Sequence, residues 1–329
     1  MYLITGGAGF LGAHLVRRLT AAGESVRVFD IGARRSMSPS VEMVRGDVLD
    51  VRSLRIAARG AHALFHLAAL LPRGGAPSEL MHGINVGGTA NAIRAAIEAG
   101  VSRFVFVSSA DVYGYPAHMP VREDAPMEPL GPYGRNKLEA EECCRRAWRE
   151  HGLETVILRP TVLVGSGLTD RFLLLLLASM ARNQPIAVVG EGRNRFQLTG
   201  VEDCAEACWL AAAVRGIGGE AFNIGSADPP PFVEQAEQVR ARTGTRAPLW
   251  KVPQEPAATV LRWLGRLHLL PLQPEYIPFL YQDFVLDISK ARAQLGWEPR
   301  LNNVDMLVQA YRWYLNRKRP SGWQEAPAA

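Results

Sequence analysis

Two short motifs in this chain combine residues that can move a proton. Tyr133 and Lys137 are four positions apart, so on a helix they share one face. A free phenol has a pKa near ~10 and is a poor base at neutral pH, but a neighbouring ammonium favours the phenolate and lowers that pKa. Ser108 and Ser109 follow the apolar run 104–107, and the carboxyl ends of parallel strands are where open α/β sheets bind ligands. Together these side chains could exchange a proton with an alcohol or a ketone.

A glycine pattern near the amino terminus predicts a phosphate-binding turn. The apolar run 2–4 leads into a GxxGxxG pattern and then into residues with helical spacing. A strand that turns directly into a helix presents backbone N–H groups and the positive end of the helix dipole to a pyrophosphate. In this pattern the first glycine permits the turn, the second the approach of the phosphates, and the third close helix packing. The residues expected to contact a dinucleotide here are Gly6, Gly9, Phe10, Leu11 and Gly12.

The next strand-like run, 25–29, ends at Asp30. An acidic residue at this distance from the glycines lies where the adenosine ribose of a dinucleotide would bind. Its carboxylate accepts hydrogen bonds from the 2′- and 3′-hydroxyls and repels a 2′-phosphate, so NAD is favoured over NADP. Arg34 and Arg35 follow closely and could soften this preference.

The elements that must position these residues alternate along the chain. Strand-like runs occur near Leu3, Val28, Met43, Leu64, Phe104 and Val156, and helical stretches separate them, notably 81–99 and 133–150. This alternation predicts a doubly wound parallel (Rossmann) α/β sheet with a smaller, interleaved C-terminal substrate lobe. We expect the sheet domain to span 1–160, with 196–225 returning to it. The lobe would comprise 161–195 and 226–317, and 318–329 would form a flexible tail.

The motifs taken together resemble those of extended short-chain dehydrogenases/reductases of the NAD-dependent epimerase/dehydratase type. The similar segments extend over nearly the whole chain and keep one order. They are 5–12, 46–48, 66–69, 85–89, 108–114, the Tyr133/Lys137 pair, 158–160, 201–203, 222–225 and 287–292.

The resemblance implies a role for each matching residue. Asp47 and Val48 would contact adenine, and Leu67 and Ala68 would line the cofactor at a strand end. Ser109 would hydrogen-bond the reacting oxygen, Tyr133 would exchange its proton, and Lys137 would hold the nicotinamide ribose and keep Tyr133 acidic. Pro160 would begin the loop that passes the carboxamide. Val107, at the end of its strand, is also expected to bind the cofactor.

Three departures from the family pattern concern the substrate. Relatives that act on nucleotide sugars commonly carry Asn where this chain has Val162, and a phosphate-clamping Arg where it has Phe196. Arg195 is adjacent to that position, and Arg195, Arg193 or Arg171 could substitute from another backbone position. Asp111 stands where sugar dehydratases often carry Glu, but Ala110 replaces their second acid, which makes 4,6-dehydration improbable. Asp111 is either a catalytic carboxylate or the residue that begins an Asx-type turn.

Three functions remain open from the sequence. The first is hydride transfer at a secondary alcohol or ketone of an apolar substrate, supported by Val162, Phe196 and other apolar residues of the lobe. These other residues are 173–177, Trp250, Trp263, Leu269 and Leu270, and a lobe core would explain them equally well. The second, weighted almost equally, is nucleotide-sugar 4-epimerisation or 4-keto reduction. The third, disfavoured by the intact Ser/Tyr/Lys set, is a catalytically silent NAD-binding regulator.

The bulk properties fit a cytoplasmic enzyme with a small-molecule substrate. The chain has 329 residues, of which 48% are hydrophobic, and a net charge of +5. No basic run with interleaved aromatic residues indicates nucleic-acid binding, and the longest apolar stretch, 172–181, is too short to span a bilayer. The spacing of the four cysteines is not that of a disulfide framework. Neither the cysteines nor the seven histidines have the spacing of a metal site. The resemblance further implies a homodimer formed through helices 81–99 and 133–150.

Overall fold

The computed structural model describes residues 1–32, 40–72, 77–267 and 269–317. Within these residues, seven strands form one sheet in the order β10-β6-β5-β4-β1-β2-β3, and every neighbouring pair is parallel. The predicted doubly wound parallel sheet is therefore confirmed. The strands are β1 (Tyr2–Thr5), β2 (Val26–Asp30), β3 (Glu42–Arg45), β4 (Ala63–His66), β5 (Arg103–Val107), β6 (Glu154–Pro160) and β10 (Ala221–Ile224).

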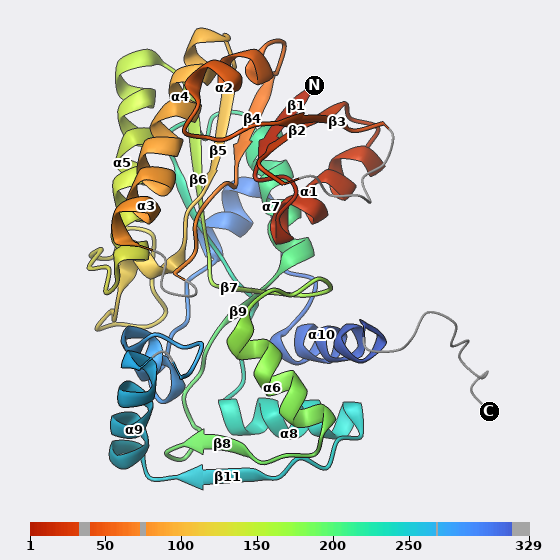
Figure 1. The fold of residues 1–329 in the computed structure, drawn as a ribbon, viewed down its shortest axis with the longest axis vertical. Coiled ribbons are helices and arrows are strands. Elements are labelled where there is room, and N and C mark those ends of the chain that lie inside the picture. The colour runs from red at the N-terminus through yellow and green to blue at the C-terminus, as the bar shows by residue number, and fades with distance from the viewer. Residues whose placement is uncertain (33–39, 73–76, 268, 318–329) are drawn as a thin grey trace, which may run out of the picture.

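Helices cover both faces of this sheet because its strands are apolar on both sides (Figure 1). In β1, Ile4 packs into the core beneath α1 (Phe10–Ala21) and α7 (Val201–Ala213), whereas Leu3 packs into the core on the opposite face. That second core lies beneath three helices, namely α2 (Val51–Ala58), α4 (Gly88–Glu98) and α5 (Pro132–His151). A short helix, α3 (Ser78–His82), and a π-helical turn, η1 (Gly83–Gly87), lead into α4. Alternating side chains that are all buried are typical of parallel sheets enclosed by crossover helices.

The remaining elements form a second body beyond the carboxyl ends of the main strands (Figure 1). Two small parallel pairs, β7 with β9 and β8 with β11, are accompanied by helices. The elements are β7 (Val162–Val164), α6 (Arg171–Ala181), β8 (Ile186–Val189), β9 (Leu198–Gly200), α8 (Phe232–Thr243), β11 (Leu249–Val252), α9 (Gln254–Arg266) and α10 (Asn303–Arg317). A shorter helical turn, η3 (Pro274–Leu280), packs beside α9. The turns η2 (Ala110–Tyr113) and η4 (Ala291–Leu295) belong with the sheet instead, because η2 lies against α5 and η4 packs into the core beneath α1 and α7. Leu177, Met180, Val239 and Tyr311 belong to a separate core within this lobe.

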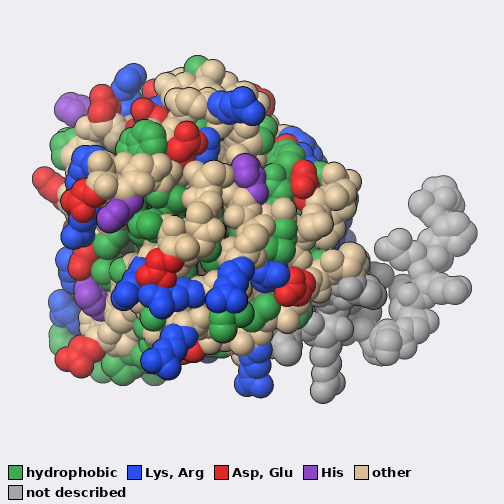
Figure 2. Space-filling model, turned by 90° about the horizontal axis from the view of Figure 1, so that it is seen from above, with side chains coloured by type: hydrophobic (Ala, Val, Ile, Leu, Met, Phe, Trp, Pro, Cys, Tyr) green, Lys and Arg blue, Asp and Glu red, His purple; other side chains and the backbone are tan. Residues whose placement is uncertain are grey.

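Several sequence-based expectations concern the periphery of the molecule. The segment expected to be a tail, 318–329, lies outside the described residues, as do Arg34 and Arg35. Among the described residues, no helix has the length and apolarity that crossing a membrane requires. Figure 2 shows the molecule from above, where acidic and basic side chains are interspersed over the surface.

Part of the apolar C-terminal sequence is surface, not core. Trp250, Trp263 and Leu269 are 60%, 60% and 68% exposed. A lobe core was one explanation of these residues, and the structure rules it out for these three.

Candidate active site

The predicted acid–base residues meet at the carboxyl edge of the central sheet. β5 ends at Val107, and α5 begins at Pro132, a residue that suits the first position of a helix. Tyr133 and Lys137 therefore occupy the first two turns of α5, and both side chains are buried. The Nζ of Lys137 donates a 2.8 Å hydrogen bond to the carbonyl oxygen of Val107 and lies 5.8 Å from the centre of the Tyr133 ring.

The surroundings of Lys137 set its charge. Burial lowers the pKa of Lys137 to about 8, although nearby Cys144, Glu141 and Asp111 oppose the shift. The amine therefore remains mostly protonated at neutral pH, where it can favour the phenolate of Tyr133. It also lies 4.8 Å from the centre of the Phe106 ring, a cation–π contact.

The two serines after β5 differ in their surroundings. Ser108 is buried, and its Oγ has no hydrogen-bond partner among the described residues. Ser109 is partly exposed, and its Oγ accepts a 3.2 Å hydrogen bond from the backbone N–H of Asp111, which caps η2. The accessible hydroxyl is thus that of Ser109, the serine to which the sequence assigned a role.

The glycine turn is packed so tightly that it requires glycine. Gly6 has a φ of +73°, and a Cβ there would lie 2.7 Å from the backbone nitrogen of Ala68. A Cβ on Gly12 would lie 2.4 Å from the carbonyl oxygen of Gly6. Leu67, beside Ala68, donates its N–H to the carbonyl oxygen of Thr5 at 3.0 Å. The structure therefore brings the turn and the end of β4 together, as a shared cofactor site requires.

The first turn of α1 completes this cradle. Gly9 is exposed at the helix N-cap, and the N–H groups of the first helical turn have no partner within a helix. Leu11 is buried, whereas Phe10 is half-buried and packs edge-on against His14 with ring centres 5.6 Å apart.

Asp30 has a structural task that the sequence did not reveal. Its carboxylate accepts hydrogen bonds from the backbone N–H groups of Ala8 and Gly32, each 2.9 Å long. The side chain at the end of β2 thus fastens the glycine turn, in addition to lying where a ribose is expected.

The other residues predicted to bind the cofactor lie at or near strand ends. Asp47 is exposed, and its carboxylate accepts the N–H of Leu49 at 2.9 Å. Val48 is buried against α4, where a Cβ on Gly88 would lie 2.7 Å from its side chain. Pro160 is buried at the end of β6.

His66 occupies a buried polar chain beneath the site. Its Nδ1 lies 2.7 Å from the hydroxyl of Thr5, and its Nε2 lies 3.1 Å from the hydroxyl of Thr89. Burial, assisted by the charge of Lys137, lowers the pKa of His66 to about 3. The imidazole is therefore neutral at physiological pH, which fits the structural role expected for it.

Asp111 joins the sheet domain to the C-terminal lobe. Its carboxylate accepts a 2.9 Å hydrogen bond from the hydroxyl of Tyr276, which belongs to η3. Burial raises the pKa of the Asp111 carboxyl, and the hydrogen bond from Tyr276 opposes that shift. The sequence offered no signal for this pairing because Tyr276 is 165 residues away in the chain.

The remaining predicted substrate residues have different environments. Phe196 packs with Phe279 and Phe284, with ring centres 5.7 and 6.2 Å away. Arg195 is half-exposed and forms an ion pair of 2.9 Å with Asp283. Val162 lies on β7 and is 37% exposed. An aromatic cluster therefore surrounds Phe196, the position at which a phosphate-binding arginine would be expected. The neighbouring guanidinium, that of Arg195, is already paired with Asp283.

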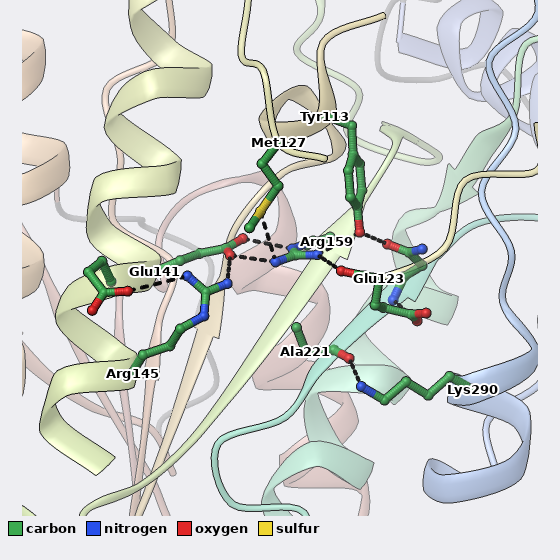
Figure 3. A network of polar contacts seen from close by, with 10 residues as sticks. Tyr113, Glu123, Met127, Glu141, Arg145, Arg159, Ala221 and Lys290 are labelled. Carbon is green, nitrogen blue, oxygen red and sulfur yellow. Dashed lines mark hydrogen bonds and ion pairs between the residues drawn. The ribbon is translucent and has the colours of Figure 1, made fainter. Parts of the chain in front are cut away.

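A buried charge network supports the helix that carries Tyr133 and Lys137 (Figure 3). Arg159 on β6 donates from Nε and Nη2 to the carboxylate of Glu141 on α5, at 2.9 and 2.7 Å. Arg159 also donates to the hydroxyl of Tyr113 at 2.6 Å, and Tyr113 in turn donates to Asn223 at 2.7 Å. Glu141 lies one helical turn after Lys137, so the network fixes α5 against β6 close to the acid–base pair. The sequence analysis did not predict the pairing of Arg159 with Glu141. The signal was present, because an arginine inside the apolar run of β6 indicates a buried charge that needs a partner.

Comparison with known proteins places this geometry in context. The model of the NAD dependent epimerase/dehydratase family matches residues 2–225. The UDP-glucose 4-epimerase of Lactobacillus helveticus is 27% identical over 98% of this chain and 99% of its own length. The 3 beta-hydroxysteroid dehydrogenase/Delta 5→4-isomerase of Mycobacterium tuberculosis is 30% identical over 95% and 90%. The structure of MoeE5 in complex with UDP-glucuronic acid and NAD has a TM-score of 0.79 at 28% identity, covering 96% of this chain and 99% of that one.

Proposed function

This chain belongs to the NAD-dependent epimerase/dehydratase family, of the extended short-chain dehydrogenase/reductase type, and we propose that Ser109, Tyr133 and Lys137 assist hydride transfer at a secondary alcohol or ketone carbon. The observation that carries the proposal is the buried contact of Lys137 with Val107, which holds an ammonium beside the ring of Tyr133. Membership of this enzyme family disfavours the silent regulator.

NAD is the cofactor of the family, and the residues at the glycine turn suit it. The Gly6 and Gly12 positions leave no room for a Cβ, so the turn, the end of β4 and α1 pack closely together. Gly9, exposed at the N-cap of α1, would let the backbone approach a pyrophosphate. Asp30 keeps lone pairs beyond the two that hold Ala8 and Gly32, and these could accept ribose hydroxyls. When bound, NAD accepts and donates hydride at its nicotinamide.

The chain's own residues would move the proton. Tyr133 would take it from the substrate hydroxyl during oxidation and return it during reduction. Ser109 would donate a hydrogen bond to the same oxygen from its partly exposed hydroxyl. Lys137 would remain charged and would stabilise the phenolate of Tyr133 between these steps.

The environment of the predicted substrate residues favours an apolar secondary alcohol or ketone. Phe196 lies in an aromatic cluster, and the guanidinium of Arg195 is paired with Asp283. A diphosphate would have to displace the Asp283 carboxylate before it could bind Arg195, so this arginine would contribute little to its affinity. The similarity to a 3 beta-hydroxysteroid dehydrogenase/isomerase supports the same substrate class.

Nucleotide-sugar 4-epimerisation or 4-keto reduction is the second candidate. The similarity to a UDP-glucose 4-epimerase and to a structure complexed with UDP-glucuronic acid favours it. An epimerase would retain and recycle its NAD, whereas a dehydrogenase or reductase would release it.

We also propose that the protein is a cytoplasmic homodimer. All four cysteines are free thiols, which suits a reducing compartment. The dimer rests on the family resemblance, and sedimentation velocity would measure it.

The test combines cofactor binding with turnover of two substrate panels. Purified protein is mixed with NAD and either 3β-hydroxysteroids or UDP-sugars, while reduced nicotinamide and sugar epimers are measured. Tyr133→Phe should slow turnover by about 10²–10⁴-fold and leave NAD affinity nearly unchanged, because only the proton relay is removed. Tyr311→Phe, in the lobe core, is the matched control and should behave as wild type. Unimpaired turnover by Tyr133→Phe would refute the assignment, and epimerisation of a UDP-sugar with retained NAD would select the second candidate.

A further inference from the structure

The outer face of α9 carries large apolar side chains that the protein does not cover. Val260, Trp263 and Leu267 are 56%, 60% and 60% exposed, and their spacing places them on one side of the helix. Leu267 is the C-cap of the helix, and Leu269, two residues later, is 68% exposed. We refer to these four residues as the α9 stripe. Figure 1 shows α9 at the outer edge of the lobe.

A different side of α9 attaches the helix to the lobe. Ala258 and Gly265 are its buried residues. A Cβ on Gly265 would lie 2.9 Å from the carbonyl oxygen of Leu272 and 3.3 Å from Pro274. The apolar residues of α9 therefore extend beyond the side that packs against the lobe. The α9 stripe is the part of them that remains exposed. Exposed apolar surface of this kind marks an interaction site.

The charges on α9 indicate the chemistry of the partner. Arg262 and Arg266 are on the same helix, whose carboxylate, Glu255, lies in the first turn. Among the described residues neither guanidinium has an ion-pair partner at salt-bridge distance. The chain as a whole carries a net charge of +5. An apolar stripe that contains a tryptophan and is flanked by arginines is typical of helices that lie in the interface of an anionic bilayer.

We propose that the α9 stripe docks this protein on the surface of a membrane that contains anionic lipids. The apolar side chains would enter the boundary between headgroups and acyl chains, and Arg262 and Arg266 would contact lipid phosphates. A second copy of the chain is a poorer partner, because a symmetric contact would bring the same arginines together.

A chain of contacts links α9 to the candidate site through η3. Gly265 packs against the residues that lead into η3, and η3 carries Tyr276, the hydrogen-bond partner of Asp111. An apolar substrate could then reach the site from the bilayer. This route rests on the proposed function, whereas the docking itself does not.

The experiment measures binding of the whole 329-residue chain to vesicles, without any substrate. Vesicles of phosphatidylcholine alone, and of phosphatidylcholine with phosphatidylserine, are pelleted with wild type and variants. Wild type should pellet with the anionic vesicles. Trp263→Ser/Leu267→Ser should weaken that binding by about tenfold or more, because two large apolar groups no longer leave water. Arg262→Gln and Arg266→Gln should each weaken it by roughly fivefold on anionic vesicles only.

The control is Ile56→Ser on α2, which removes an apolar side chain of similar exposure, 61%, from the sheet domain. It should bind vesicles as wild type does, and unchanged NAD affinity in every variant would show that the fold is retained. Failure of wild type to bind either vesicle would overturn the proposal, as would equal losses in the Ile56 and α9 variants. Self-association abolished by Trp263→Ser/Leu267→Ser, with vesicle binding unaffected, would assign the α9 stripe to a second copy instead.

Discussion

The hydroxyl of Tyr276 donates a 2.9 Å hydrogen bond to the carboxylate of Asp111 and so ties η3 of the C-terminal lobe to the turn that follows Ser109. Burial raises the pKa of both groups, and the Asp111 carboxylate raises that of Tyr276 further. Tyr276 thus gives the Asp111 carboxylate a hydrogen-bond donor in addition to Ser109. Because the contact joins the sheet domain to the C-terminal lobe, it helps to fix the position of the lobe at the candidate site.

We expect Tyr276→Phe to destabilise the protein by about 1–3 kcal/mol, because a buried carboxylate loses a donor. The free energy of unfolding in urea measures the loss. In a double-mutant cycle with Asp111→Ala, the two losses should not add, since both variants remove the same contact. Additive losses would show that the hydrogen bond contributes nothing. NAD affinity should stay unchanged in both variants because neither residue contacts the glycine turn.

Asp30 should affect NAD binding in two separable ways. Asp30→Ala removes both the expected ribose contact and the fastening of Ala8 and Gly32, so NAD affinity should fall by about tenfold or more. Asp30→Asn keeps one acceptor oxygen and removes the charge, so it should lose less NAD affinity and should narrow the preference over NADP. Titration calorimetry with both dinucleotides measures these effects. Asp50→Asn, at the N-cap of α2, is the control, and equal affinities in all four proteins would contradict the placement of the ribose.

The fold and the proximity of Tyr133 to Lys137 could be predicted because their signals are local. The apolar runs of β1 and β5, the glycines of the first turn and the spacing of Tyr133 and Lys137 each lie within one or two elements. The parallel sheet then follows from the alternation of strands and helices, since crossover connections leave few other arrangements.

What sequence reasoning missed depends on contacts between distant segments. Tyr276 meets Asp111 across 165 residues, and its own surroundings in the sequence carry no motif. The partner of Arg159 could be narrowed to a carboxylate but not to Glu141, because the choice depends on how α5 lies against β6. Whether Trp263 is buried or exposed depends on which side of α9 faces the lobe. The sequence does not determine that side, because apolar residues occur on more than one face of the helix.

His66 should make the stability of the fold depend on pH at pH values below the ordinary pKa of histidine. Its pKa is about 3 in the folded protein and about 6.5 when unfolded. Between these values the unfolded chain binds a proton that the folded chain does not, so stability rises with pH and falls as pH decreases. From about pH 6.5 to about pH 5 the loss should approach roughly 2 kcal/mol. His66→Gln should flatten this part of the profile, whereas His82→Gln, at a half-exposed position, should leave it as in wild type. An identical slope in all three proteins would mean that His66 is protonated when folded.

The Arg159–Glu141 pair should be far more costly to break than the Arg195–Asp283 pair. Both are arginine–carboxylate contacts with two guanidinium donors, but the side chains of the first are 1% and 0% exposed and those of the second 50% and 34%. Arg159→Met leaves the Glu141 charge buried with Arg145 as its remaining cation, and we expect a loss of about 3–5 kcal/mol. Arg195→Met leaves Asp283 in contact with water and should cost at most about 1 kcal/mol. Urea unfolding of the two variants provides the comparison. The double variant Arg159→Met/Glu141→Leu should regain part of the loss, because it removes the unpaired charge as well as its partner. If the two single variants were equally stable, the buried network would not be what holds α5 and its Lys137 against β6.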